Sequence, residues 1–362
     1  MALLGLLGLS FQRNNLNDYV SATSRMASTI ESSPARQEDK GVDYQPSKIE
    51  QYIISHMAAL GLDKKAPELV STCHLWNQHN STPYHKEMHE FVANLEEYYK
   101  RINEFSMNVT DLRQHFDNSR NDICDTLELH KEGLPALFPN NKLSYTRAGW
   151  VEPLLPPQRH PNWCIDGTQN SLASIEYLIH DFGQMCRQLK PNSRTVLFDM
   201  GASLMFSTKW PSPVLALVAL FRKFGIPFDH IYAYEMTKQD PQKVFEMVPD
   251  HMSAAYHWIN VGVDPDPQSK NNPFNLLLDN FNEDDLVIVK LDIDTPWIEQ
   301  KLAHQLLADD RLLRIIDHFY FEHHVNQKEL APYWGRMGET VEESLTLFQE
   351  LRKKGVASHF WT

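Results

Sequence analysis

The sequence RTVLFDMGASLM, residues 194–205, carries the clearest structural signal in this chain of 362 residues. Its apolar run at 196–198 is typical of a strand that is buried on both faces of a parallel sheet. Gly201 follows where a loop must begin, and a residue without a Cβ permits a sharp turn and a close approach of a ligand to the backbone. Ligands of open α/β sheets bind beyond the carboxyl ends of the strands, where the strand order reverses. The stretch therefore predicts a nucleotide-type cofactor site directly after this strand.

From about residue 165 onward, predicted strands alternate with predicted helices. Strands are expected at 194–199, 229–235, 257–263, 285–292, within 315–324 and at 356–361. Helices are expected at 172–189, 213–224, 241–247, 297–308 and 339–354. Alternation at this spacing indicates βαβ units. We therefore predict an α/β fold over residues 165–362, with a doubly wound, mostly parallel, Rossmann-like sheet.

The first part of the chain has a different pattern. Residues 10–46 are rich in Ser, Asn, Gln and charge, and we predict a flexible leader over residues 1–46. Residues 47–130 are predicted to form a helical region, with helices at 47–60, at 83–105 and from an N-cap at Thr110 to 123. Residues 131–164 are proline-rich and are predicted to form an irregular crossing, because proline at this density opposes helices and central strands.

The composition restricts the class of partner. The chain is 42% hydrophobic and 22% charged, and its net charge of -13 argues against a nucleic acid. Its four cysteines form no Cys-x-x-Cys, which argues against a zinc cluster or redox motif but leaves one or two disulfides open. No clear transmembrane segment is present, since no apolar run approaches 18 residues. The acceptor patterns at Asn80 and Asn108 and a short apolar N-terminus leave the cytoplasm and the lumen of the secretory pathway both open.

Polar residues follow four of the predicted strands. They are Asp199, Gly201 and Ser203 after the first strand, Glu235 after the second, Lys290, Asp292 and Asp294 after the fourth, and Glu322, His323 and His324 after the fifth. A carboxylate in the position of Glu235 can accept hydrogen bonds from both hydroxyls of a ribose. Because the carboxyl ends of parallel strands meet at one edge of the sheet, we expect these side chains to gather there.

Residues 194–362 resemble the FkbM-like branch of the class I S-adenosylmethionine-dependent methyltransferases. The matching segments are Asp199-Met-Gly201-Ala202-Ser203 for the family's Asp-x-Gly-Ala-Asn, Glu235 for its acid after the second strand, Asn260 for its Asn after the third, Lys290-Leu-Asp292-Ile-Asp294-Thr295 for its Lys-x-Asp-x-Glu-Gly, and Phe321-Glu322-His323 for its later strand. The final strand also fits the antiparallel strand with which such enzymes close. The sequence departs from the family at Met205, Thr295 and Trp297.

The resemblance implies a cofactor, a reaction and a set of site residues. S-adenosyl-L-methionine would be bound by Asp199, Gly201, Ala202, Ser203, Glu235 and Asn260, with its ribose at Glu235. Asp292, Asp294 and His323 would be the catalytic residues. The reaction implied is methyl transfer to an oxygen, or less often a nitrogen, of a small-molecule or glycan acceptor. Since alternate residues of a strand face opposite sides, Glu322 and His324 are expected on one face and His323 on the other.

Two other interpretations of the same residues stay open. Asp292, Asp294 and Glu322 offer hard oxygen ligands that suit Mg²⁺ or Mn²⁺. Asp292-Ile-Asp294 after an apolar strand is also the pattern with which many glycosyltransferases hold Mn²⁺ and a sugar diphosphate. A third interpretation is a catalytically silent methyltransferase fold that serves as an interaction protein. It predicts that side chains such as Met205 and Trp297 fill the edge of the sheet.

Overall fold

The computed structural model describes residues 42–77, 84–113, 129–165, 172–203, 212–335 and 337–362. Within it, Val42–Thr362 forms one compact unit. Most of the predicted leader, residues 1–41, lies outside the described residues, as do Met205 and Asn80.

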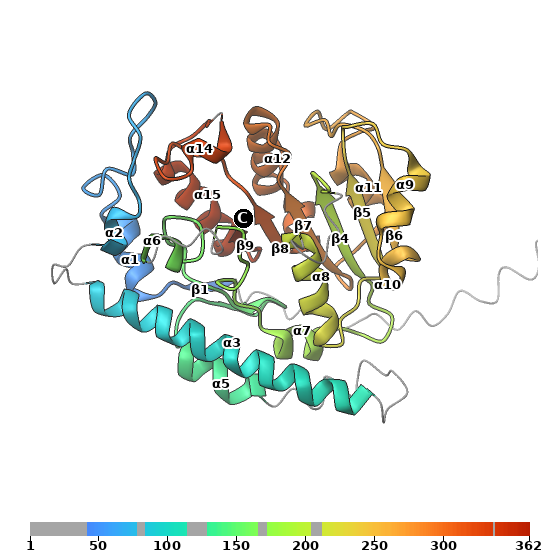
Figure 1. Cartoon of the computed structure of the whole chain (residues 1–362), viewed down its shortest axis with the longest axis horizontal. Coiled ribbons are helices and arrows are strands. Elements are labelled where there is room, and N and C mark those ends of the chain that lie inside the picture. Colours follow the sequence, from blue (N-terminus) through green and yellow to red (C-terminus); the bar gives the residue numbers. More distant parts are fainter. Residues whose placement is uncertain (1–41, 78–83, 114–128, 166–171, 204–211, 336) are drawn as a thin grey trace, which may run out of the picture. The chain divides into compact units, whose positions relative to one another are not determined.

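A six-stranded parallel sheet forms the centre of this unit (Figure 1). Its strands are β4 (Thr195–Met200), β5 (His230–Tyr234), β6 (Tyr256–Ile259), β7 (Leu286–Leu291), β8 (Ile316–Phe321) and β9 (Ala357–Phe360), in the spatial order β6-β5-β4-β7-β8-β9. Every neighbouring pair is parallel. Counted from β4 as the first strand, this is the order 3-2-1-4-5-6 of doubly wound nucleotide-binding sheets. The predicted α/β fold with a parallel sheet is confirmed.

The last strand corrects one expectation. The resemblance implied an antiparallel final strand, whereas β9 pairs with β8 in parallel, with His318 opposite Ala357 and Phe321 opposite Phe360. The helix α15 (Val341–Lys353) precedes β9 and packs on it, after a capping box formed by Thr340 and Glu343. A helical crossover brings the chain back to the starting end of the sheet, so that the next strand runs parallel to the one before it.

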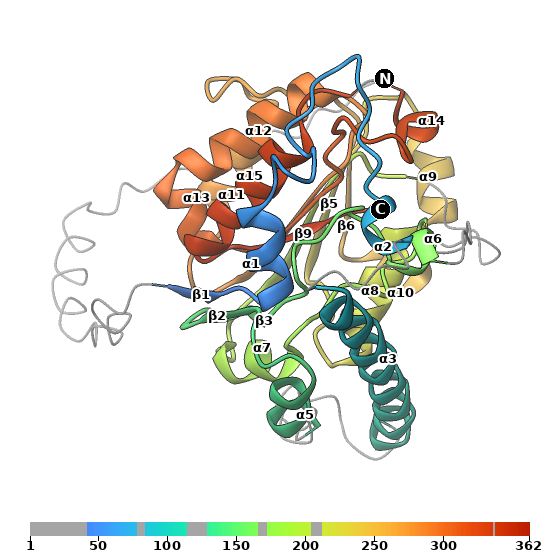
Figure 2. The same ribbon diagram turned by 90° about the vertical axis from the view of Figure 1, so that its left-hand side faces the viewer.

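Helices cover both faces of the sheet (Figure 2). One side carries α11 (Pro273–Asn280), α12 (Pro296–Ala308), α13 (Asp310–Ile315) and α15, and the other carries α8 (Pro213–Lys223), α9 (Pro241–Met247) and α10 (Asp250–Ser253). The helices α8, α9 and α11 begin alike: Ser212, Asp240 and Asn272 each cap the first turn with a side-chain oxygen, and a proline follows. Proline suits this position because its fixed φ is helical and its missing N–H has no partner to lose there.

The described helices before the sheet are α1 (Lys48–Ser55), α2 (His74–Asn77), α3 (His85–Arg113), α5 (Leu129–Leu137), α6 (Asn162–Ile165) and α7 (Phe182–Gln188). The helices predicted at 47–60 and 83–105 are present as α1 and α3, and residues 114–123 of the predicted third helix lie outside the described residues. Thr110 lies inside α3 and does not cap a third helix, because no glycine or proline interrupts residues 105–110. The predicted helix at 172–189 is reduced to α7.

Residues 131–164 contain more regular structure than their prolines predict. The helix α5 includes Pro135. The strands β2 (Lys142–Ser144) and β3 (Gly149–Trp150) form an antiparallel pair that β1 (Asp43–Gln45) extends. This hairpin was missed, although it lies in the part of the crossing without proline, residues 140–152. A disulfide joins Cys73 to Cys164 of α6, across 91 positions of the sequence.

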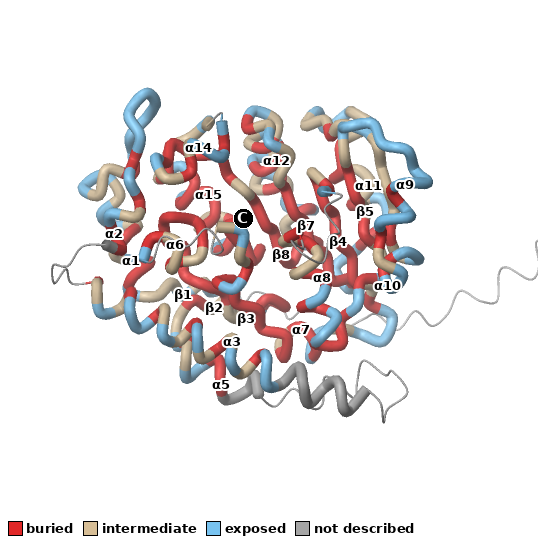
Figure 3. The backbone as a smooth tube through the Cα atoms, viewed as in Figure 1, coloured by how far each residue is buried: buried red, intermediate tan, exposed pale blue. Residues whose placement is uncertain are grey.

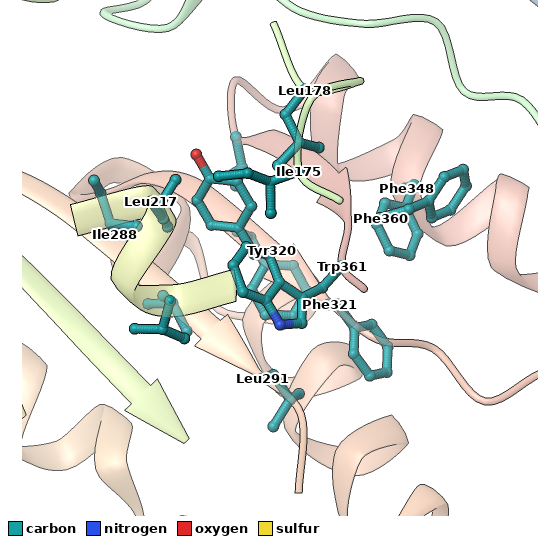
Figure 4. Close-up of a cluster of buried hydrophobic side chains, with 14 of the residues drawn as sticks. Ile175, Leu178, Leu217, Ile288, Leu291, Tyr320, Phe321, Phe348, Phe360 and Trp361 are labelled. Carbon is teal, nitrogen blue, oxygen red and sulfur yellow. The ribbon is translucent and has the colours of Figure 1, made fainter. Parts of the chain in front are cut away.

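The core lies where helices pack on both faces of the sheet. Figure 3 shows the central strands almost entirely in the colour of buried residues, and every residue of β4, β7, β8 and β9 is buried. Figure 4 shows side chains of β7, β8 and β9 packed together with Leu217 of α8 and Phe348 of α15. Burial on two faces explains the nearly continuous apolar runs of these strands. Asp199, Lys290 and Asp317 are charged exceptions, and the first two lie near the carboxyl ends of their strands.

Candidate active site at the carboxyl edge of the sheet

A cavity of about 430 Å³ lies at the carboxyl ends of β4, β5 and β7. It is lined by Gly201, Ser203, Tyr234, Glu235, Met236, Thr237, Val261, Gly262, Val263, Asp292, Ile293, Asp294, Thr295 and Ile298. The chain proceeds from β4 to β5 and β6 on one side and returns to β7 on the other, so that the strand order reverses between β4 and β7. The cavity therefore occupies the position at which α/β sheets bind their ligands.

Gly201 is required by the packing of the two central strand ends. Its φ is +89°, and a Cβ built on it would lie 1.6 Å from the backbone oxygen of Asp292. The backbone N–H groups of Gly201 and Ala202 donate to Tyr234 O at 3.0 and 2.9 Å. The sequence located this turn correctly, but the neighbour that excludes a side chain is the backbone directly after β7, and both amides are used within the protein. Ser203 lies on the cavity wall.

Asp199 lies beneath the cavity as one of two carboxylates that face a buried lysine. Nζ of Lys290 is 3.1 Å from Asp199 Oδ1 and 3.1 Å from Asp292 Oδ2, and it donates to Gly201 O at 2.8 Å. Burial alone would lower the pKa of Lys290, but the two carboxylates outweigh it and raise that pKa. Lys290 therefore holds the ends of β4 and β7 together, and Asp199 itself does not line the cavity.

Glu235 and Asn260 shape the loop that follows β5. Glu235 lines the cavity, and its Oε1 accepts a hydrogen bond from Thr237 N at 2.5 Å. The Asn260 side chain donates to Glu235 O at 2.7 Å and to Thr237 O at 2.8 Å, and its Oδ1 accepts from Gln239 N at 3.0 Å. The structure therefore places Glu235 at the predicted position, whereas the Asn260 amide is used to hold the loop.

Asp292 shares the cavity edge with a second carboxyl group. Its side chain forms a hydrogen bond with Glu322, which follows β8, and an ion pair with Lys290. Burial is the main cause that raises the pKa of Asp292, Lys290 opposes it, and the charge of Glu322 adds to it. The result is a pKa of about 8. The structure thus joins two of the predicted residues in one pair of carboxyl groups.

Glu322 is held in place by partners from distant segments. Burial opposes its ionisation, but the hydrogen bond with His324 and the charge of Arg159 outweigh it and lower the pKa of Glu322 to about 2. Arg159 comes from the proline-rich crossing and pairs with Glu322 Oε1, which also accepts a hydrogen bond from Trp334 Nε1 at 3.0 Å. Trp334 belongs to the short helix α14 (Ala331–Trp334). The crossing therefore contributes directly to this edge of the sheet.

His323 points away from this group, as the alternation of side chains predicts. Its Nδ1 lies 3.0 Å from Ser344 Oγ on α15, and its Nε2 lies 3.0 Å from Glu339 Oε2. Glu322 and His324 share the other face, where His324 Nε2 is 3.2 Å from Glu322 Oε2. The structure brings His324, and not the predicted His323, to the acids of the edge.

One residue at this edge, Glu299, was missed by the sequence analysis, whereas His324 was expected on the same face as Glu322. His324, Glu322 and Asp294 form a group whose ligand atoms suit a metal ion, so that His324 takes the place that was given to Asp292. Glu299, in the first turn of α12, is fully buried below the loop after β7. Burial raises its pKa to about 7, against the opposing charge of His324. An acid in the first turn of a helix is a signal that could have drawn attention to Glu299.

Comparison of the chain with protein-family models, with curated proteins and with solved structures found no match. The resemblance to the FkbM-like methyltransferases therefore stays a prediction, and function is inferred from the geometry of the site. Among the described residues, no helix combines the length and the apolar character that crossing a bilayer requires.

Proposed function

We propose that this chain is an S-adenosylmethionine-dependent methyltransferase that acts on a hydroxyl oxygen of a small-molecule or glycan acceptor. The observation that carries the proposal is the cavity of about 430 Å³ at the reversal of strand order, with Glu235 and Asp292 in its wall. Cavities of roughly 300–1,000 Å³ are typical of cofactor and small-molecule sites.

The residues of the cavity wall suit the parts of this cofactor. Glu235 follows the second strand of the sheet, where a carboxylate accepts hydrogen bonds from ribose hydroxyls. Val261 and Val263, after β6, and Ile298, on α12, supply apolar surface for an adenine ring. Asp292 and Asp294 lie in the wall after β7, where the methyl group and the acceptor would meet.

The reaction would be a direct displacement. The bond between the acceptor oxygen and the methyl carbon forms as the bond between that carbon and the sulfonium sulfur breaks, and sulfur keeps the electron pair. The proton of the acceptor hydroxyl leaves to a base, for which the ionised form of Asp292 is our candidate because this side chain is in the cavity wall. Since the pKa of Asp292 is about 8, the ionised form increases as the pH rises toward 8. The remaining contribution of the protein is to position the two reactants.

Calorimetric titration of the full chain with S-adenosylhomocysteine tests the proposal. We expect one binding site per chain, and we expect Glu235→Gln to weaken binding by about 1–3 kcal/mol, because an amide cannot accept both ribose hydrogen bonds. Glu246→Gln is the matched control, since Glu246 is an exposed glutamate on α9 and lies outside the cavity wall. Absence of binding by the wild-type chain would remove the proposal, and equal affinity in all three proteins would remove Glu235 from it.

The same titration separates the other interpretations. A glycosyltransferase would bind a nucleotide sugar only with Mn²⁺ and would not bind S-adenosylhomocysteine. The silent interaction protein predicted that side chains such as Met205 and Trp297 fill the edge. Met205 lies outside the described residues, and Trp297 is 51% exposed and is not part of the cavity wall. The cavity formed by the described residues therefore favours ligand binding.

A further inference from the structure

We propose that Asp294, Glu322 and His324 bind one divalent transition-metal ion at the carboxyl ends of β7 and β8. These side chains provide two carboxylate oxygens and one imidazole nitrogen, and the three ligand atoms all lie within 4.8 Å of one another. A mixed set of oxygen and imidazole ligands suits ions such as Mn²⁺, Fe²⁺ or Zn²⁺ better than Ca²⁺, which prefers oxygen alone.

The distances between the ligand atoms fit a common ion. His324 Nε2 is 3.2 Å from Glu322 Oε2 and 3.8 Å from Asp294 Oδ1. With metal–ligand bonds of about 2.1 Å, ligands at right angles lie about 3 Å apart and opposite ligands about 4.2 Å apart. Both distances fall within this range. The Asp294 side chain is 86% exposed, so that it can adjust to complete the coordination.

Two of the three ligands are already oriented by outer partners. Oε1 of Glu322 accepts hydrogen bonds from Arg159 and from Trp334 Nε1, which leaves Oε2 directed to His324. The Trp334 ring also stacks on the His324 ring, with centroids 5.1 Å apart. Outer partners of this kind fix the rotamers of metal ligands and are a regular part of metal sites.

A buried carboxylate next to the three ligands is a second, independent observation. Glu299 is fully buried, and its Oε1 accepts from Ile293 N at 2.8 Å. The backbone N–H of Thr295 also interacts with its carboxylate, whereas Oε2 has no partner at hydrogen-bond geometry among the described residues. The charge of Glu299 interacts with those of His324 and Glu322. A buried carboxylate oxygen without a partner is costly. A cation held by the neighbouring ligands would compensate this charge.

The metal site is independent of the proposed cofactor, although it adjoins the same cavity through Asp294. A metal ion with three protein ligands keeps coordination positions free for oxygen atoms of a bound acceptor. This role in acceptor binding rests on the proposed function, whereas the metal site itself does not. The carboxyl groups of this edge are Asp292, Asp294, Glu299 and Glu322, and the neighbouring fixed cations are Lys290 and Arg159.

The test is a titration of the full chain with Mn²⁺ after treatment with EDTA and dialysis. The electron paramagnetic resonance signal of free Mn²⁺ is measured at each step and gives the amount of ion that is bound. We expect one Mn²⁺ per wild-type chain, and affinity at least about tenfold lower in Asp294→Asn and in His324→Gln. Asp294 is exposed, so its substitution is not expected to disturb folding, and circular dichroism checks both variants. Asp250→Asn is the control, because Asp250 is an exposed aspartate of α10, before β6 and away from the carboxyl edge.

The outcomes separate this proposal from the proposed function. Loss of Mn²⁺ binding in Asp294→Asn with wild-type binding in Asp250→Asn supports the site. Absence of a stoichiometric site in the wild-type chain, or equal affinity in Asp294→Asn and Asp250→Asn, overturns it. S-adenosylhomocysteine is titrated separately in the presence of EDTA, so that either proposal can fail while the other stands.

Discussion

Two buried groups of acids and histidines in this protein differ in how fully their charges are compensated. The inner cluster consists of Glu50, Glu152, Arg352 and His359, and the edge cluster consists of Asp292, Glu299, Glu322 and His324. Both clusters join segments that are distant in the sequence. Only the edge cluster has a residue in the cavity wall, namely Asp292.

The charge of Glu152 in the inner cluster is matched by nearby partners, whereas burial outweighs the charge of Arg352 and raises the pKa of Glu50. Arg352 is fully buried and donates to Glu152 Oε1 and to the backbone oxygens of Glu152 and Ser358. Both oxygens of Glu152 accept hydrogen bonds, including one from Ile179 N at 3.0 Å. Burial opposes the ionisation of Glu152, but His359 and Arg352 outweigh it and lower the pKa to about 2. This cluster has the character of a structural tie.

The edge cluster contains two acids, Asp292 and Glu299, whose pKa values are raised by burial and by neighbouring negative charge. The pKa of Asp292 is about 8 and that of Glu299 is about 7. Acids whose pKa values are displaced in this direction beside a cavity are a feature of functional sites. The comparison teaches that a buried charge alone does not indicate function, whereas incomplete compensation next to a cavity does.

The largest loss of stability is expected when the cation of the inner cluster is removed. Arg352→Met should lower the free energy of unfolding by about 3–5 kcal/mol, because it leaves Glu152 buried without its cation. Arg311→Met is the control. Arg311 pairs with Asp309 at the surface, where its side chain is 65% exposed, and its loss should cost less than about 1 kcal/mol. Denaturation in urea measures both, and equal losses would contradict the assignment of Arg352 as a structural tie.

A smaller loss of stability is expected when the pH is lowered. Because the pKa of Glu152 is lowered from 4.5 to about 2 in the folded chain, the unfolded chain binds the proton more readily. The stability that this group contributes is present above about pH 4.5 and is lost as the pH falls to about 2, by roughly 3 kcal/mol. The measurement is the unfolding free energy of the wild type and of Glu152→Gln between pH 6 and 2. The difference between the two proteins should narrow with acid, and a constant difference would contradict the lowered pKa.

Local patterns in the sequence were sufficient to predict the sheet and the side of the sheet on which the cavity lies. Apolar runs gave the strands, and the loop at Gly201 gave the turn at the reversal of strand order. Glu235 and Asp292 were placed at the cavity because both directly follow such runs. The direction of β9 was not predictable in the same way, because a short apolar strand has the same pattern in parallel and antiparallel pairings.

The partners of the site residues could not be predicted, because they depend on contacts between distant segments. Arg159 meets Glu322 across 163 positions of the sequence. Lys290 was recognised only as part of a motif, and its position between two carboxylates appears only once β4 and β7 are paired. The choice between His323 and His324 depended on which face of the chain after β8 meets α15.

The smallest change in stability is expected from the substitution Asp292→Asn in the edge cluster. With a pKa of about 8, the Asp292 carboxyl group is mostly protonated at pH 7, so that a neutral amide of the same shape replaces it with little loss. Lys290 keeps Asp199 as a counterion at 3.1 Å. We expect the free energy of unfolding to change by less than about 1 kcal/mol, whereas Glu152→Gln in the inner cluster should lose about 2 kcal/mol or more. Urea denaturation of the two variants at pH 7 makes the comparison directly. A loss in Asp292→Asn as large as that in Glu152→Gln would mean that the edge cluster is also a structural tie, because its acid would then be held by the fold in its charged form.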